Sequence, residues 1–392
     1  MTRIRWIVLP LVLAAASTLR GEPEKLIPVQ RIGWPAETRS LEMFSAMTLG
    51  PDGLVYAGTC NNEKIGARLI SFDPNSGTQE VLVDVFEVTG EDGTKTFPQS
   101  KIHSQICFDS RGVAWFGTHS FDWNTLDQYE KSPGDYSGGY LISYNPKTRK
   151  ACSHGILGAH ESIMALALAE SVGKIYAVLH PTSRFVVYDL KTGKTTDKGA
   201  ILGYPSRAIV ALKDGRAITF TLTGDVVRYS PRTDKLEKLP VAVPTFGGNT
   251  NREHNNPFDL AVSVDEKSLY GIGYTSGLLF EYCPDDGPDG SIRSLGVAFG
   301  DDTGPGYRPD LSIAMAVGKD GRVYYAGYSL SPGQIGCYDP QTGKRSYLGQ
   351  MDAGPGTQPL GAGAMIALPD GRLVVATFDQ KQTYYNLFKA EP

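Results

Sequence analysis

Short runs of alternating apolar and polar residues occur along the whole chain, and turns rich in Asp, Gly and Pro separate them. Two phrases recur among these runs. One, of the form Asp-Gly-x-apolar-Tyr-x-x-Gly, has seven variants, at 51–59, 110–118, 172–180, 213–221, 265–273, 319–327 and 369–377. The other, similar to Tyr-Asp-Pro-x-Thr-Gly, follows the first six of them. Repeats of roughly 40–60 residues made of short strands and tight turns predict a β-propeller.

The sixth repeat shows the expected blade most clearly, with strands predicted at 312–317, 322–327, 334–338 and 344–348. Applied to the whole chain, this pattern gives seven blades, at approximately 41–86, 100–153, 159–198, 204–240, 255–298, 310–350 and 360–390. The seventh shows only three strands, whereas 25–33 resembles the fourth strand of other blades. We therefore expect an all-β, seven-bladed propeller in one domain, 23–392, whose N-terminal strand completes the last blade and closes the ring.

The first 22 residues have the order of a secretory signal peptide. Arg3 and Arg5 precede an apolar stretch at 6–16, and small residues follow at 14–17. The apolar stretch is short for a membrane span, so an uncleaved anchor is the weaker alternative. We expect export to the periplasm or the medium, with no membrane association after cleavage.

Charge and cysteine content exclude some partners. The formal net charge is −4 and no basic run occurs, which argues against nucleic acid. Local Arg and His side chains can still bind an acidic sugar. The five Cys form no Cys-x-x-Cys pair, and most are expected to be small buried apolar residues. One disulfide is conceivable, but spacing does not select it.

Insertions at 89–99, 121–138, 243–255 and 301–309 all fall on connections from a fourth strand to the next first strand, or from a second strand to a third. Both connections lie on one face of a propeller, which favours a binding surface there. Five of the six His also map to this face, with His103 expected opposite Thr118. The candidates at this face are His103, His119, His160, His180, Tyr204, Arg207, His254, Asn255, Asn256, Tyr274, Tyr307, Arg308 and Tyr328.

This set of side chains suits β-elimination on a uronic acid. A His near neutrality can remove or supply a proton, and an Arg can neutralise the carboxylate beside the proton that leaves. Glycoside hydrolysis by paired carboxylates is less favoured, because Glu161, Asp259 and Asp310 form no evident pair. A metal could be held by His103, Gln105, His119, His160 and His180, but no tight spacing supports a catalytic one. A structural Ca²⁺ or Zn²⁺ stays open.

The segment 101–120, KIHSQICFDSRGVAWFGTHS, resembles a phrase of seven-bladed propeller polysaccharide lyases, namely ulvan lyases and rhamnose–glucuronate lyases. It is also similar to a propeller family that cleaves rhamnosyl-glucuronate, and 160–190 and 206–216 resemble the same group. The resemblance implies a site of two His, one Arg and one Tyr. It assigns His103, His119 and Arg207, and leaves the Tyr open among Tyr204, Tyr274 and Tyr328.

We therefore expect a lyase that cleaves a uronate-containing polysaccharide or oligosaccharide and requires no cofactor. The expected catalytic residues are His103, His119, Arg207, Tyr204 and Tyr274. The expected substrate-binding residues are His160, His180, Asn256, Tyr328 and Arg308. The alternatives are a rhamnosyl-glucuronate hydrolase, a propeller that binds a glycan or protein without catalysis and, less favoured, a lactonase-like metal propeller.

Overall fold

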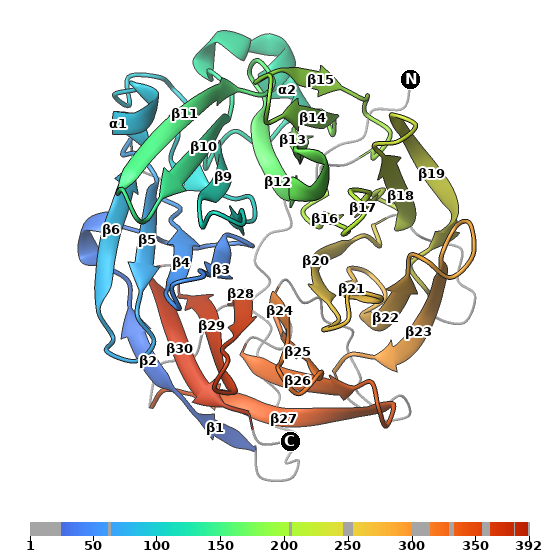
Figure 1. The fold of residues 1–392 in the computed structure, drawn as a ribbon. Coiled ribbons are helices and arrows are strands. Elements are labelled where there is room, and N and C mark those ends of the chain that lie inside the picture. Colours follow the sequence, from blue (N-terminus) through green and yellow to red (C-terminus); the bar gives the residue numbers. More distant parts are fainter. Residues whose placement is uncertain are drawn as a thin grey trace.

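The computed structural model describes residues 25–61, 64–203, 206–245, 254–299, 314–328, 333–354, 361–379 and 381–390. They form seven sheets, antiparallel except where β1 joins one of them, placed around a central axis, as Figure 1 shows. In the figure the first strand of each blade lies nearest the axis and the last lies at the rim. The predicted all-β, seven-bladed fold is confirmed. The expected signal peptide, Tyr204 and Arg308 lie outside the described residues.

The strands follow the repeat in order. Blades one and two contain β3 Met47–Leu49, β4 Val55–Gly58, β5 Arg68–Phe72, β6 Gln79–Asp84, β7 Lys101–Ile102, β8 Cys107–Phe108, β9 Ala114–His119, β10 Tyr140–Asn145 and β11 Lys150–Ile156. Blades three and four contain β12 Ser162–Ala169, β13 Lys174–His180, β14 Phe185–Asp189, β15 Thr195–Asp197, β16 Val210–Ala211, β17 Ala217–Phe220, β18 Asp225–Ser230 and β19 Lys235–Ala242.

The remaining blades continue the same order. They contain β20 Pro257–Val262, β21 Leu269–Gly273, β22 Leu278–Cys283, β23 Ser291–Val297, β24 Ala314–Val317, β25 Val323–Ala326, β26 Gln334–Asp339, β27 Lys344–Asp352, β28 Gly361–Ala367, β29 Arg372–Phe378 and β30 Thr383–Lys389. Two short helices, α1 Val85–Thr89 and α2 Leu126–Lys131, lie in the connections that flank β7 and β9. All five Cys are free.

The N-terminal segment closes the ring, but only in part as predicted. β2, Gln30–Gly33, pairs antiparallel with β30 and supplies the fourth strand of blade seven, which confirms that part of the prediction. β1, Leu26–Pro28, instead pairs parallel with β27 of blade six, so assigning all of 25–33 to blade seven was wrong. The apolar side chains of Ile27 and Val29 pack into the core shared by blades six and seven, which favours this split.

Side-chain hydrogen bonds explain the first recurring phrase. In blade one, Asp52 accepts the backbone N–H of Leu54 at 3.2 Å and the Tyr56 hydroxyl at 2.6 Å. Asp320 repeats both bonds in blade six, with the Tyr324 hydroxyl at 2.9 Å. The Gly between the Asp and the strand, such as Gly53 with φ +81°, adopts a left-handed conformation that other residues rarely take. In these two blades the phrase is therefore a turn whose geometry its own Asp and Tyr hold.

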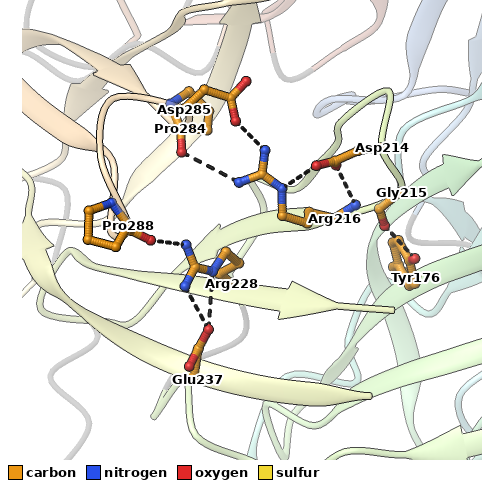
Figure 2. A network of polar contacts seen from close by, with 9 residues as sticks. All are labelled: Tyr176, Asp214, Gly215, Arg216, Arg228, Glu237, Pro284, Asp285 and Pro288. Atoms are coloured by element: carbon orange, nitrogen blue, oxygen red, sulfur yellow. Dashed lines mark hydrogen bonds and ion pairs between the residues drawn. The ribbon is translucent and has the colours of Figure 1, made fainter. Parts of the chain in front are cut away.

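The two phrases also meet across neighbouring blades. Arg216, in the first phrase of blade four, donates to the Asp285 carboxylate and to the Pro284 carbonyl in the second phrase of blade five (Figure 2). Arg372 of blade seven makes the same contacts with blade one, at 2.7 Å to the Pro74 carbonyl and 2.6 Å to the Asn75 amide oxygen. The repeat thus joins blades as well as shaping them.

Candidate functional site

Three imidazoles meet near the axis at the face that carries the insertions. His103 follows β7, His119 ends β9 and His180 ends β13. The ring centroids of His103 and His119 are 5.6 Å apart, and those of His119 and His180 are 5.2 Å apart. We call these three residues the histidine cluster. Blades two and three bring them together because β9 and β13 end at the same level of adjacent sheets.

The first strand of blade two is interrupted where the cluster begins. Ile102, and not His103, lies opposite Thr118, so the predicted register was wrong by one residue. Regular pairing resumes only at Cys107. In the interval, the Ser104 hydroxyl accepts the Gly117 backbone N–H at 2.7 Å, in place of a ladder partner. Because the ladder is interrupted here, the His103 side chain does not have to follow the alternation of sides that a regular strand imposes.

Hydrogen bonds fix the tautomers of two imidazoles. Nδ1 of His103 donates to the Met164 carbonyl at 3.0 Å, and Nδ1 of His119 donates to the Ser120 carbonyl. Because a carbonyl only accepts, each Nδ1 carries the proton and each Nε2 carries a lone pair. The Nε2 of His103 is buried and bonds to no described group. The ring nitrogens of His180 are also buried, which lowers the pKa of His180, and the backbone of Trp123 and Asn124 lies close enough to oppose a small part of that shift. Buried polar atoms without partners are rare and favour a ligand-binding role.

Burial and nearby cations keep the cluster neutral. Burial lowers the pKa of His103 well below its usual value, with Lys101, Arg207 and His119 adding to the shift. Burial, then His180 and Lys101, lower the pKa of His119 in the same way. The pKa of His180 falls to about 3, through burial and then through Arg207 and Lys101. At neutral pH the three imidazoles are therefore uncharged.

Arg207 supplies the positive charge beside the cluster. Its guanidinium carbon lies 4.7 Å from the ring centroid of Phe258 and 5.2 Å from that of Phe44. Its Nε is buried without a hydrogen bond, and no salt bridge joins it to a carboxylate in the described chain. The Gln105 amide donates to the Arg207 carbonyl at 2.7 Å and accepts the Leu166 N–H at 3.0 Å, which fixes this segment. A guanidinium held in this way is ready to pair with a carboxylate.

An aromatic cluster completes the site. It consists of Phe44, Phe258, Phe378, Tyr274 and Tyr328, from blades one, five, six and seven. Phe44 links it to the histidine cluster, with its ring centroid 6.0 Å from that of His103. His254 stacks on Tyr274 at 4.1 Å, and burial, followed by Arg207, lowers the pKa of His254 to about 4. Contact with the buried Asn256 amide opposes this shift. Such rings suit the apolar face of a sugar.

Sequence reasoning missed Lys101 and the three Phe. Lys101 is only 7% exposed, and its Nζ lies 3.0 Å from a carboxylate oxygen of Glu42 and 4.7 Å from the Phe44 centroid. The available signal was its place two residues before His103 in the phrase KIHS. The Phe residues carry no comparable signal, because their meeting depends on packing between blades.

Other candidates have different surroundings. The structure does not place His160 in a ring contact with the cluster among the described residues; its Nδ1 donates to the Tyr136 carbonyl at 2.7 Å. A φ of +62° turns this residue toward the 121–138 insertion. Glu161 accepts from Thr182. Asp259 accepts the backbone N–H groups of Leu260 and Met315, and burial raises its pKa to about 7. These two carboxyls therefore have separate structural partners.

Two further features bear on ligands. Within the described residues, no group of three or more His, Cys, Asp or Glu side chains is arranged to hold a metal ion. A cavity of about 310 Å³ is lined by Gln105, by Glu170 and by apolar residues such as Phe108, Leu168 and Ala211. Because that cavity contains none of the cluster side chains, we place the candidate chemistry at the histidine cluster and Arg207.

No protein-family model and no curated protein matches the chain. Its fold is similar to the extracellular domain of a hybrid two-component system of B. thetaiotaomicron, with 14% identity, 93% of this chain and 40% of that chain covered, and a TM-score of 0.62. It is also similar to virginiamycin B lyase from Staphylococcus aureus, with 11% identity, 92% and 98% covered, and a TM-score of 0.62. The chain spans about two fifths of the length of that extracellular domain.

A third similar fold is the propeller domain of Swd1 from Myceliophteria thermophila, with 11% identity, 93% and 99% covered, and a TM-score of 0.62. These similarities define the class of protein as a seven-bladed propeller, and at such identities they show the fold alone. The extracellular domain of a two-component system and a lyase are among the proteins that share it. None of the described helices has both the length and the apolar character of a membrane span.

Proposed function

We propose that the protein is an exported lyase that cleaves a uronate-containing oligosaccharide or polysaccharide by β-elimination. One observation carries the proposal: neutral imidazoles with unprotonated Nε2 atoms lie beside Arg207, a guanidinium that forms no described salt bridge. The reaction removes the C5 proton of the uronate and expels the 4-oxygen. It therefore needs a base, a positive charge at the carboxylate and a proton donor.

The residues divide these tasks. Arg207 pairs with the carboxylate and stabilises the negative charge that develops on it when the C5 proton leaves. The Nε2 of His103 or His119 takes that proton, since its Nδ1 is already bonded to a carbonyl. The electron pair of the C5–H bond forms the C4–C5 double bond as the C4–O bond breaks. Tyr274 and Tyr328 of the aromatic cluster are the candidates that protonate the departing oxygen. No cofactor enters this sequence of steps.

Substrate binding would also activate the base. Arg207 and Lys101 contribute to the lowered pKa values of His103, His119 and His180. A bound carboxylate offsets part of that positive charge and so raises the imidazole pKa toward the range where proton removal is effective. Under this proposal the bases are weak in the free protein and become stronger only in the complex.

The proposal is tested by the ultraviolet absorbance of an unsaturated uronate. Purified protein, offered ulvan, glucuronan, pectin fragments and rhamnosyl-glucuronate, should generate that absorbance with at least one of them. His103→Ala and His119→Ala should each reduce the rate by about 10²–10⁴-fold, as expected for loss of an acid–base group. Arg207→Ala should reduce it by about 10²–10³-fold. Arg322→Ala, at a surface turn, is the matched control and should leave the rate unchanged.

A second candidate function is glycan binding without catalysis. The similarity to the extracellular domain of a two-component system favours it, and so does the burial of the histidine cluster. Retention of a uronate glycan with no product of any kind would support this candidate and contradict the lyase. Release of a saturated sugar would instead indicate a hydrolase of the rhamnosyl-glucuronate type.

A further inference from the structure

Two cations share the Phe44 ring, and among the residues that the structure describes Lys101 alone has a carboxylate partner. The Lys101 Nζ and the Arg207 guanidinium carbon lie 4.7 Å and 5.2 Å from the Phe44 centroid. Lys101 forms an ion pair with Glu42 at 3.0 Å, whereas no described carboxylate pairs with Arg207. With the imidazoles neutral, the part of the site that the structure describes has one positive charge without a carboxylate partner, that of Arg207.

The fold holds the Lys101–Glu42 pair in place. Cys60 forms isolated β-bridges to both residues, so their backbones lie on either side of it. The Cys60 thiol also donates to the same Glu42 carboxylate oxygen at 3.7 Å. The Glu42 side chain is 25% exposed and that of Lys101 is 8% exposed, so the carboxylate is the more accessible partner. These contacts fix the position of the Lys101–Glu42 pair in the site.

The pair also adjoins the chemistry directly. Lys101 lies opposite His119 in the β7–β9 ladder and two residues before His103. Its Nζ is 5.9 Å from the ring centroid of Phe121, at the start of the 121–138 insertion. A sugar whose carboxylate meets Arg207 would therefore place a neighbouring substituent near Lys101 and Glu42.

We propose that Glu42 determines specificity by limiting the site to one anionic group. Its carboxylate neutralises Lys101 and repels a second anion, so the preferred ligand has a uronate and an uncharged neighbouring sugar. Hydroxyl groups of that sugar can form hydrogen bonds to Lys101 and Glu42 together. A sulfate or a second carboxylate at the same place is repelled by the Glu42 carboxylate. This inference deepens the proposed function and rests on it for the identity of the sugar.

The test compares two ligands that differ only in charge. Rhamnosyl-glucuronate disaccharide and the same disaccharide sulfated on rhamnose are titrated calorimetrically into wild type, Glu42→Gln and Glu80→Gln. Glu80 pairs with Arg149 on the exposed rim, so Glu80→Gln removes a paired carboxylate elsewhere. Wild type and Glu80→Gln should bind the unsulfated disaccharide at least about tenfold more tightly. Glu42→Gln should abolish or reverse this preference while changing affinity for the unsulfated form by less than about threefold.

Equal affinity of wild type for both ligands would overturn the inference, as would an equal shift of both affinities in Glu42→Gln. If wild type binds neither disaccharide, the proposed sugar is wrong, but the charge limit is still tested by butyrate and succinate, which carry one and two carboxylates. Histidine resonances in NMR should then respond to butyrate in wild type, and to succinate only in Glu42→Gln. A succinate response in wild type equal to that for butyrate would contradict the inference without bearing on the sugar.

Discussion

A buried imidazole that has cations nearby must fold in its neutral form, and this links the histidine cluster to the stability of the protein. His180 illustrates the link, because burial and then Arg207 and Lys101 lower its pKa to about 3. In the unfolded chain the same side chain titrates near its ordinary value of about 6.5. Between these two values the unfolded state binds a proton that the folded state does not, so the free energy of unfolding decreases as the pH falls.

His180→Gln should therefore make the protein less sensitive to acid. Each such imidazole contributes a slope of up to about 1.4 kcal/mol per pH unit below pH 6.5, because one extra proton binds to the unfolded chain. Urea unfolding at pH 7.5 and pH 5 should show a smaller loss of stability for His180→Gln than for wild type. His160→Gln is the control for removing an imidazole outside the cluster. Identical losses in wild type and His180→Gln would contradict the neutral, buried state of this residue.

An Arg at one position of the repeat joins neighbouring blades. Its contribution to stability depends on which hydrogen-bond acceptors the next blade places near it. Arg216 reaches the turn between β22 and β23, and Arg372 reaches the turn between β5 and β6. Arg322 holds the same position in blade six, where the fourth strand of the next blade is β2 from the N-terminal segment. Arg322 instead contacts Asp320 and Asp339 of its own blade.

Arg216→Ala should consequently cost more stability than Arg322→Ala. Arg216 bonds to the Pro284 carbonyl and the Asp285 carboxylate of the next blade, with its side chain 19% exposed. Loss of these charge-assisted bonds should lower the free energy of unfolding by about 1–3 kcal/mol. Arg322 forms only partly exposed contacts within its blade, so Arg322→Ala should cost less than about 1 kcal/mol. Urea unfolding measures the free energy of unfolding of both variants. A larger decrease for Arg322→Ala than for Arg216→Ala would contradict a stabilising role of the Arg216 contacts between blades.

The strands could be predicted closely because period-two alternation and turn chemistry are local. The predicted third strand of blade six, 334–338, is β26 Gln334–Asp339, and the predicted second strand, 322–327, contains β25 Val323–Ala326. The error at 25–33 arose where a parallel pairing replaced the expected one, which alternation alone cannot distinguish. The register error at His103 arose where Ser104 replaces a backbone partner.

At the scale of the whole molecule, the propeller fold brings residues at equivalent positions of the sequence repeat together in one site. Position within the blade identified His103, His119, His180 and Arg207 as neighbours in space, because equivalent strand ends meet around one axis. It could not identify Lys101 or Phe44, since their roles depend on side chains from different blades packing against each other. The local pattern therefore predicted the histidines and Arg207. The second cation, Lys101, and the Phe44 ring that it shares with Arg207 became evident only from packing between blades.

Closure of the ring depends on β2, because it covers the edge that β30 would otherwise expose. Several contacts accompany the ladder. Arg31 donates to Asn386 at 3.0 Å and lies 4.9 Å from the Tyr384 centroid, and the Gln79 amide of blade one donates to the Gly33 carbonyl at 2.8 Å. β2 thus joins the last blade to the first. β1 adds only an outer parallel strand to blade six, and its Leu26 is half exposed.

Two shortened chains separate these roles. A chain that starts at Val29 lacks β1, and a chain that starts at Trp34 lacks β1 and β2. The first should lose about 1–2 kcal/mol from the short ladder and the packing of Ile27, whereas the second should lose on the order of 3–5 kcal/mol in total from both ladders and the buried part of Ile32. The exposed edge of β30 should also make the second chain associate as its concentration rises, which light scattering after size exclusion would detect. Equal stability and monomeric behaviour of both chains would show that the ring is closed without β2.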